Sequence, residues 1–160
     1  MASTREMRLR IRSIKNLAQV TRALETVSAS KVRRAIQANQ ATKPYAQKAW
    51  KTLIHLARQP GHQSLHPLLA ERETVSKVLV LMISSDRGLA GAYNVNIVRE
   101  TLHHFNPSPV PVTYVTVGRK GRDMLLRRRK TVLAEFAGLS PNPTFIEAAP
   151  IGQLVVDDFL

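Results

Sequence analysis

The sequence predicts an α/β protein in two parts, a long N-terminal helix and an α/β domain with a mainly parallel sheet. Residues 1–43 contain neither glycine nor proline and are rich in helix-forming residues. From residue 77 onward, apolar runs of strand length alternate with segments of helical spacing. Parallel strands joined by right-handed crossovers produce this alternation. We therefore expect a long basic helix over 1–58, a linker over 59–74 and an α/β domain over 75–160.

Hydrophobic residues in the N-terminal segment follow helical spacing and predict one narrow apolar stripe. The stripe consists of Met7, Ile11, Ile14, Ala18 and Thr21, and then shifts phase to Leu24, Val27, Val32 and Ala35. At 1.5 Å per residue, this helix would extend about 65 Å, roughly twice the width of a small domain. Because it has no local core, we expect it to need a partner along its length. Pro44 predicts either a kink or a boundary, and Gln59-Pro60-Gly61 predicts the end of the helix.

Most of the positive charge lies on this helix. The chain has a formal net charge of +13, and residues 1–58 hold 13 Lys/Arg against 2 acidic residues. A field of this kind favours a partner with an acidic surface, such as nucleic acid, anionic lipid or an acidic protein. The chain has no cysteine, which excludes a disulfide scaffold and a thiolate metal site. No apolar run approaches the roughly 18 residues that would span a bilayer.

The second part of the chain is predicted as alternating strands and helices. We expect strands over 77–83, 110–117 and 131–136, and helices over 91–105, over 119–129 and from near Pro150 onward. The first strand is apolar on both faces, which predicts that it is buried. In helix 119–129, Met124, Leu125 and Leu126 are expected to face inward. The chain stops inside the last predicted helix, so we expect the domain to be incomplete at its C-terminus.

The segment Ser84-Ser85-Asp86-Arg87-Gly88-Leu89-Ala90-Gly91 follows the first strand, where a nucleotide site would lie in an α/β sheet. It lacks G-x-G-x-x-G spacing, and no Gly-Lys-Ser/Thr follows, so a phosphate-binding loop is not supported. We favour a tight turn in which Asp86 is a cap and Gly88 and Gly91 permit close packing. His62 and His66 are expected to be solvated loop histidines, and no catalytic set stands in a motif context.

A run of four basic residues, Arg127-Arg128-Arg129-Lys130, closes helix 119–129. A solvated C-terminus that complements the helix dipole is favoured here over a dedicated contact surface. The N-terminal helix differs, because its positive charge is too large and too extended for a solvated face alone. A nucleic-acid-binding module is one alternative for it, although the helix has few aromatic residues and no recognised binding motif. A nucleotide-binding enzyme is a third, which the missing phosphate-loop spacing disfavours.

Three separated motifs match a known family in order. They are RLRIRSIKNLAQVTRALETVSASKVRRA, VLVLMISSDRGLAGAYNVNI and GRKGRDML, and with them the chain resembles the gamma subunit of F-type ATP synthases over nearly its whole length. The resemblance implies an α/β fold with a long N-terminal coiled-coil helix and a Rossmann-like domain. In that family the N- and C-terminal segments form an antiparallel coiled coil, the rotor shaft, inside the ring of alpha and beta subunits. The α/β domain forms the foot near the membrane.

The resemblance also implies roles for particular positions. They are Arg22, Leu24, Glu25, Lys31, Arg33 and Arg34 on the shaft, and Asp86, Arg87 and Gly88 in the foot. Arg22, Leu24 and Glu25 fall where the shaft meets the acidic loop of a beta subunit. Lys31, Arg33 and Arg34 fall in a small-and-basic motif of the shaft. Asp86, Arg87 and Gly88 belong to the signature turn of the foot. Family members commonly carry methionine where Leu24, Thr26 and Val32 stand, and Cys-Gly-Gly-Phe where this chain has Ala90-Gly91-Ala92-Tyr93.

The implied function is that of a non-catalytic rotor shaft that couples proton flow through the membrane sector to ATP synthesis or hydrolysis in the alpha/beta ring. The implied partners are the alpha and beta subunits, the epsilon subunit and c-ring at the foot, and the chain's own C-terminal helix. No cofactor, nucleic acid or membrane insertion is implied. The implied location is peripheral, on the cytoplasmic face of the bacterial plasma membrane or the equivalent organellar inner membrane.

We predict that the purified chain does not hydrolyse ATP by itself, because its sequence lacks phosphate-loop spacing and a catalytic set. The measurement is phosphate release from ATP by the isolated chain. Hydrolysis that disappears on substitution of Asp86 or Arg87 would contradict the prediction.

Overall fold

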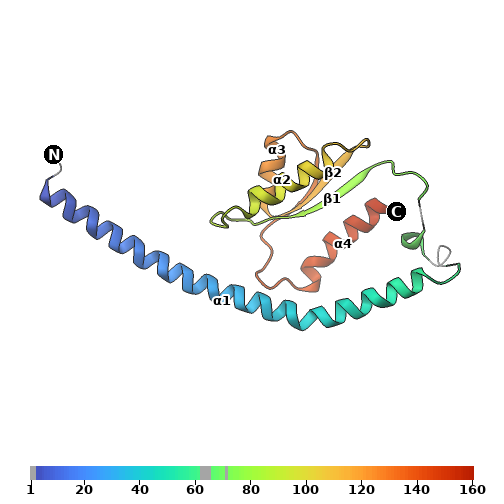
Figure 1. Cartoon of the computed structure of the whole chain (residues 1–160), viewed down its shortest axis with the longest axis horizontal. Coiled ribbons are helices and arrows are strands. Elements are labelled where there is room, and N and C mark those ends of the chain that lie inside the picture. Colours follow the sequence, from blue (N-terminus) through green and yellow to red (C-terminus); the bar gives the residue numbers. More distant parts are fainter. Residues whose placement is uncertain (1–2, 62–65, 71) are drawn as a thin grey trace. The chain divides into compact units, whose positions relative to one another are not determined.

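The computed structural model describes residues 3–61, 66–70 and 72–160, which form two compact units over 1–53 and 54–160. Figure 1 shows the helices and strands in chain order. They are α1 (Thr4–Ala57), the short 3-10 helix η2 (Pro67–Leu69), β1 (Val78–Ile83), α2 (Tyr93–Phe105), β2 (Val112–Val117), α3 (Arg119–Arg127), β3 (Val132–Phe136) and α4 (Phe145–Phe159). The predicted α/β fold class, with a long N-terminal helix and a parallel sheet, is confirmed.

Helix α1 is a single helix of 54 residues that continues through Pro44. Proline lacks the N–H that would bond to the carbonyl one turn earlier, but α1 is exposed around this position, so water can bond to that carbonyl. Threonines inside the helix donate their hydroxyls to carbonyls four residues back. Examples are Thr21 to Leu17 at 2.8 Å and Thr52 to Lys48 at 3.0 Å. These bonds satisfy the threonine hydroxyls, which can otherwise compete with the helix for backbone hydrogen bonds.

The three strands form one parallel sheet in the order β1-β2-β3. Val78 pairs with Val112 and Ile83 with Val117, while the pairing of β2 with β3 shifts register between Tyr114 and Val115. In Figure 1, α2 and α3 lie on one side of the sheet and α4 on the other. This is the arrangement that right-handed crossovers between parallel strands produce.

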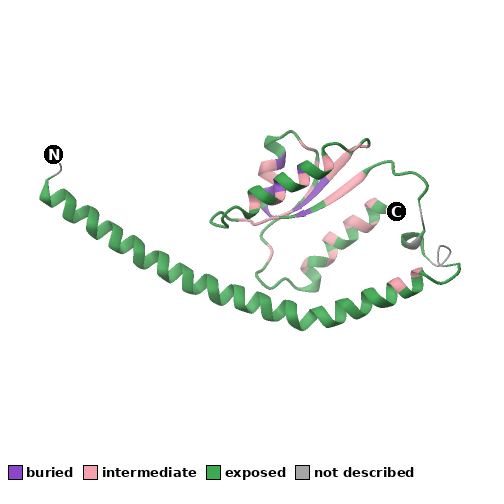
Figure 2. Cartoon of the chain, viewed as in Figure 1, coloured by how far each residue is buried: buried purple, intermediate pink, exposed green. Residues whose placement is uncertain are grey.

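The buried core lies between the sheet and α2 with α3. Its members are Met82, Val98, Leu102, Tyr114 and Leu125, and the purple segments of Figure 2 fall in these elements. Burial raises the pKa of the Tyr114 hydroxyl, because a low-dielectric environment disfavours the phenolate.

Two expected burials were wrong. Leu81 and Ile83 of β1 are 40% and 58% exposed, because β1 is an edge strand among the described residues and α4 covers only part of its other face. Leu126 of α3 is 52% exposed. At 100° per residue, it lies off the face on which Met124 and Leu125 contact the sheet and α2.

Helix α4 begins at Phe145, five residues before the expected start near Pro150. The Glu147 carboxylate accepts hydrogen bonds from the N–H of Thr144 at 2.8 Å and from its hydroxyl at 3.1 Å. These bonds lower the pKa of Glu147 and fix the first turn. Pro150 therefore lies inside the helix, and the predicted start near Pro150 was wrong.

His66 and His62 were both expected to lie in a loop. His62 lies outside the described residues. His66 precedes η2, and its Nδ1 accepts a hydrogen bond from the N–H of Leu68 at 3.2 Å.

One buried hydroxyl in the described core, that of Thr116 on β2, has no hydrogen-bond partner. We expect Thr116→Val to raise the free energy of unfolding by about 1 kcal/mol, because it removes an unsatisfied buried polar group with little change in shape. Urea denaturation measures the change. The matched substitution Thr113→Val, at a half-buried position of the same strand, should change stability by less than about 0.5 kcal/mol. Equal effects at both positions would contradict this account.

Candidate functional site

Asp86 connects the carboxyl ends of all three strands. It follows β1, and its Oδ1 accepts a hydrogen bond from the N–H of Arg119 at 3.1 Å, just after β2. Its Oδ2 accepts from the N–H of Gly138 at 2.8 Å, just after β3. The Arg119 guanidinium lies 4.0 Å from the same carboxylate. Asp86 was expected to cap its own turn, but it instead fixes two neighbouring loops.

Ser84 connects β1 to the first turn of α3. Its hydroxyl lies 3.0 Å from the carbonyl of Gly118 and accepts from the N–H of Gly121 at 2.9 Å. A Cβ on Gly118 would lie 2.2 Å from the Ser84 carbonyl oxygen, and one on Gly121 would lie 2.7 Å from the Ser84 Oγ. Gly118 also has a φ of 98°, a conformation that side chains disfavour. The SSDRGL and GRKG segments therefore meet at one edge of the sheet.

Ser85 and Asn94 connect the same turn to α2. Asn94 Oδ1 accepts from the N–H of Ser85 at 3.0 Å, and Asn94 Nδ2 donates to the Ser85 hydroxyl at 2.7 Å. The Tyr93 hydroxyl donates to the carbonyl of Ile83 at 2.9 Å. Ser84, Asn94 and Tyr93 were not predicted from the sequence as positioning residues. The only available signal was the placement of polar residues directly after a buried strand.

The loop that follows this network projects into solvent. Leu89 is fully exposed with a φ of 63°, and the Arg87 guanidinium makes no hydrogen bond or ion pair within the described chain. The expectation that Gly88 and Gly91 permit close packing was wrong, because nothing lies within 4 Å of a Cβ built on either. Gly91 is needed for its φ of 55°. The close approach occurs at Gly118 and Gly121 instead.

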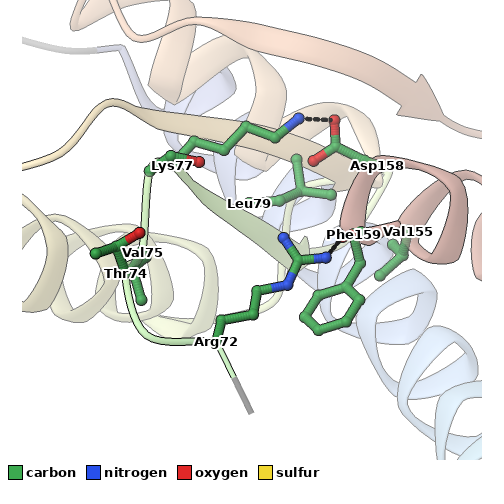
Figure 3. Close-up of a pocket in the computed structure, with 9 residues that line it drawn as sticks. Arg72, Thr74, Val75, Lys77, Leu79, Val155, Asp158 and Phe159 are labelled. Atoms are coloured by element: carbon green, nitrogen blue, oxygen red, sulfur yellow. Dashed lines mark hydrogen bonds and ion pairs between the residues drawn. The ribbon is translucent and has the colours of Figure 1, made fainter. Parts of the chain in front are cut away.

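A pocket lies between α4, the start of β1 and the segment before it (Figure 3). The Arg72 guanidinium lies 4.3 Å from the centre of the Phe159 ring and bonds to the Phe159 carbonyl. Lys77 pairs with Asp158 at 2.8 Å. Since the Asp158 carboxylate is paired with Lys77, the described residues that line the pocket offer no free acid or base. Their contacts hold α4 against β1. In the described ranges, no three His, Cys, Asp or Glu side chains gather as a metal site.

The predicted shaft positions are all exposed on α1. Arg22, Glu25 and Arg33 lie along one shallow groove with Thr26, Ala29 and Ser30. The small side chains among these lining residues allow close approach of another backbone, and the two arginines add positive charge. Leu24 is 55% exposed and, at 100° per residue, lies on another face with Lys31.

The apolar surface of α1 is wider than the single narrow stripe that the sequence predicted. Exposed hydrophobic residues over its first three-fifths are Met7, Leu9, Ile11, Ile14, Leu17, Val20, Leu24, Val27, Val32 and Ile36. At 100° per residue they cover about 200° of the circumference, because the stripe turns from the face of Met7 and Ile11 to that of Leu24 and Val27. Leu9, Leu17 and Val20 extend this second face toward the N-terminus. One antiparallel helix covers a narrower seam than this.

Comparison with known proteins identifies the family. A family model described as ATP synthase matches residues 3–160. The chain belongs to the ATP synthase family. It is 40% identical to the ATP synthase gamma chain of Dehalococcoides mccartyi (strain CBDB1), over all of this chain and 56% of that protein. It is 42% identical to the ATP synthase gamma chain of Desulfitobacterium hafniense (strain DSM 10664 / DCB-2), over 98% of this chain and 55% of that protein.

The fold matches a solved structure of the central stalk and c-ring of the Tetrahymena thermophila mitochondrial ATP synthase. The TM-score is 0.71 at 24% identity, over 87% of this chain and 59% of that chain. By sequence, the chain spans about half the length of the curated gamma chains it matches. None of its described helices has the length and apolar character that a bilayer crossing requires.

We expect Gly118→Ala to lower the free energy of unfolding by about 3 kcal/mol, because the new methyl group would overlap the Ser84 carbonyl and occupy a disfavoured φ. Gly88→Ala is the control: it adds the same methyl group in open space and should change stability by less than about 0.5 kcal/mol. Urea denaturation measures both. A Gly118→Ala chain as stable as Gly88→Ala would show that the two motifs do not pack as described.

Proposed function

We propose that this chain forms part of the central rotor shaft of an ATP synthase, with α1 as one half of a coiled coil and the α/β domain as the foot. The observation that carries the proposal is α1 itself, a helix of 54 residues without a buried residue. An isolated helix of this kind leaves its apolar surface in water, so a partner along its length stabilises it. The 40% identity to gamma chains supports the same role.

The wide apolar surface supports contact with two kinds of neighbour. The stripe of Met7, Ile11 and Ile14 fits an antiparallel partner helix, as in the coiled coil of the gamma subunits that the chain resembles. The adjacent face, with Leu17, Val20 and others, remains for the surrounding alpha and beta subunits. A shaft inside a ring is enclosed on all sides, which a helix in a free-standing coiled coil is not.

The charge of α1 fits acidic loops on the ring. The described part of α1 contains only Glu6 and Glu25 as acids, and Glu6 is already paired with Arg10 at 2.6 Å. Arg33 and Arg34 are exposed and offer forked donors to carboxylates. We assign Arg22, Leu24 and Glu25 to the contact with the acidic loop of a beta subunit, and Lys31, Arg33 and Arg34 to the small-and-basic motif.

The mechanism is coupling by differential contact. An asymmetric shaft presents a different face to each catalytic subunit. It shifts the equilibrium between the open and closed states of that subunit by the difference in the free energy of its contacts with the two states. The Asp86 and Ser84 network connects β1 to the loops after β2 and β3, so the elements of the foot are joined at one edge of the sheet. We assign the epsilon subunit and the c-ring as partners of the foot, and a peripheral position at the cytoplasmic face of the membrane.

We expect Arg33→Glu/Arg34→Glu to weaken assembly with alpha and beta subunits by about tenfold or more, since charge reversal at a desolvated contact costs more than about 1.4 kcal/mol. Co-purification of the chain with both subunits over a concentration series measures assembly. The matched control, Lys48→Glu/Lys51→Glu, changes the net charge of the same helix equally and should retain assembly.

Circular dichroism confirms that both variants keep their helix content. A salt titration against duplex DNA tests the nucleic-acid alternative. Equal losses of assembly in both variants, or binding to DNA with no assembly by the unsubstituted chain, would overturn the proposal.

A further inference from the structure

A strongly basic surface lies at the end of the α/β domain opposite the signature turn. It consists of Arg127, Arg128, Arg129 and Lys130, at and after the C-terminus of α3, and we call it the basic end. Lys130 Nζ donates to Asn106 Oδ1 at 2.7 Å, which connects the basic end to the C-terminus of α2. The last turn of α2 adds the exposed His103 and His104.

Arg129 occupies a backbone position that favours glycine. Its φ is 55°. Its N–H donates to the carbonyl of Leu126 at 2.9 Å, and the N–H of Lys130 donates to the carbonyl of Leu125 at 3.1 Å. These two bonds form a Schellman motif, in which the left-handed residue is usually glycine because a side chain there is strained. A charged side chain at this position lowers stability, so its presence points to a role for the charge.

The C-terminus of α3 does not need all four positive charges of the basic end to complement its helix dipole. The Arg128 guanidinium donates to the carbonyl of Met124 at 3.1 Å and so satisfies the helix end. Asp123, one turn before Arg127, pairs with Arg122 at 2.7 Å. Within the described residues, the guanidiniums of Arg127 and Arg129 make no hydrogen bond or ion pair, and both side chains are exposed.

We propose that the basic end binds the surface of an anionic phospholipid membrane. Arginines beside the exposed Leu126, at 52% exposure, combine charge for lipid phosphates with an apolar side chain that can enter the headgroup region. Nucleic acid fits less well, because no Tyr or Trp lies in the basic end to stack on a base. The choice of a membrane rests on the proposed function, in which the foot lies beside the c-ring.

A site-specific probe tests the proposal in the full chain. The sequence has no cysteine, so Thr131→Cys places a single environment-sensitive dye beside the basic end. Ala137→Cys places the same dye at the opposite edge of the sheet, where β3 ends. Vesicles contain phosphatidylcholine with or without phosphatidylglycerol, plus a lipid-borne quencher. Because α1 is also basic, quenching at the dye is measured rather than total binding.

We expect quenching at residue 131, but not at residue 137, on vesicles that contain phosphatidylglycerol. Arg129→Gly should raise the lipid concentration for half-maximal quenching about fivefold, because the loss of one basic residue weakens attraction to an anionic surface. The same variant should have an equal or higher melting temperature, because glycine relieves the left-handed strain, so weaker binding cannot reflect unfolding. Lys120→Gln, which removes one charge at the other end of α3, should leave the quenching curve unchanged.

Equal quenching at both dye positions, an unchanged curve for Arg129→Gly, or a dye response to duplex DNA but not to vesicles would overturn the inference. Assembly with alpha and beta subunits is measured separately. A chain that assembles with them but shows no quenching at residue 131 would refute the lipid contact and leave the proposed function intact.

Discussion

The close approach of Ser84 to the first turn of α3 is the contact on which the α/β domain depends. Without a side chain at Gly118, the Ser84 carbonyl and hydroxyl reach the backbone of α3, and a Cβ there would lie 2.2 Å from the carbonyl oxygen. This contact brings Asp86 next to the loops that follow β2 and β3, where its carboxylate bonds to two backbone N–H groups. The carboxyl edge of the sheet is therefore held by a few short polar side chains, and α2 and α3 begin from a fixed base.

The two ends of the domain differ in what they offer to a partner. At the carboxyl edge, the described side chains of Asp86, Ser84 and Asn94 are bonded within the chain, while the loop with Arg87 and Leu89 projects into solvent. At the basic end, the Arg127 and Arg129 side chains are exposed, and one of them stands where glycine would be more stable. Helices that run antiparallel to their strands produce this division, because both α2 and α3 end at the amino edge of the sheet.

Helix α1 is stabilised by local interactions, whereas the α/β domain depends on contacts between distant parts of the chain. Its 54 residues form a regular helix although none is buried, since helix propensity and local hydrogen bonds depend on near neighbours in sequence. Its wide apolar surface and unbalanced positive charge have no explanation within the helix. The proposed function accounts for both, because a shaft inside a ring of subunits is enclosed among several neighbours.

The element order, the parallel α/β class, the length of α1 and the family could be predicted from the sequence, because they depend on spacing, charge and motifs that are local in the chain. The sequence did not predict that α4 begins at Phe145, since a proline inside a helix and a proline at its start look alike until the Thr144 and Glu147 contacts are known. Nor did it predict the exposure of Leu81, Ile83 and Leu126, which depends on which elements cover a face. The role of Asp86 became clear from the fold alone, because its partners lie 33 and 52 residues away in the chain. The fold also placed Arg129 in a left-handed conformation, because that φ arises from how α3 ends before β3.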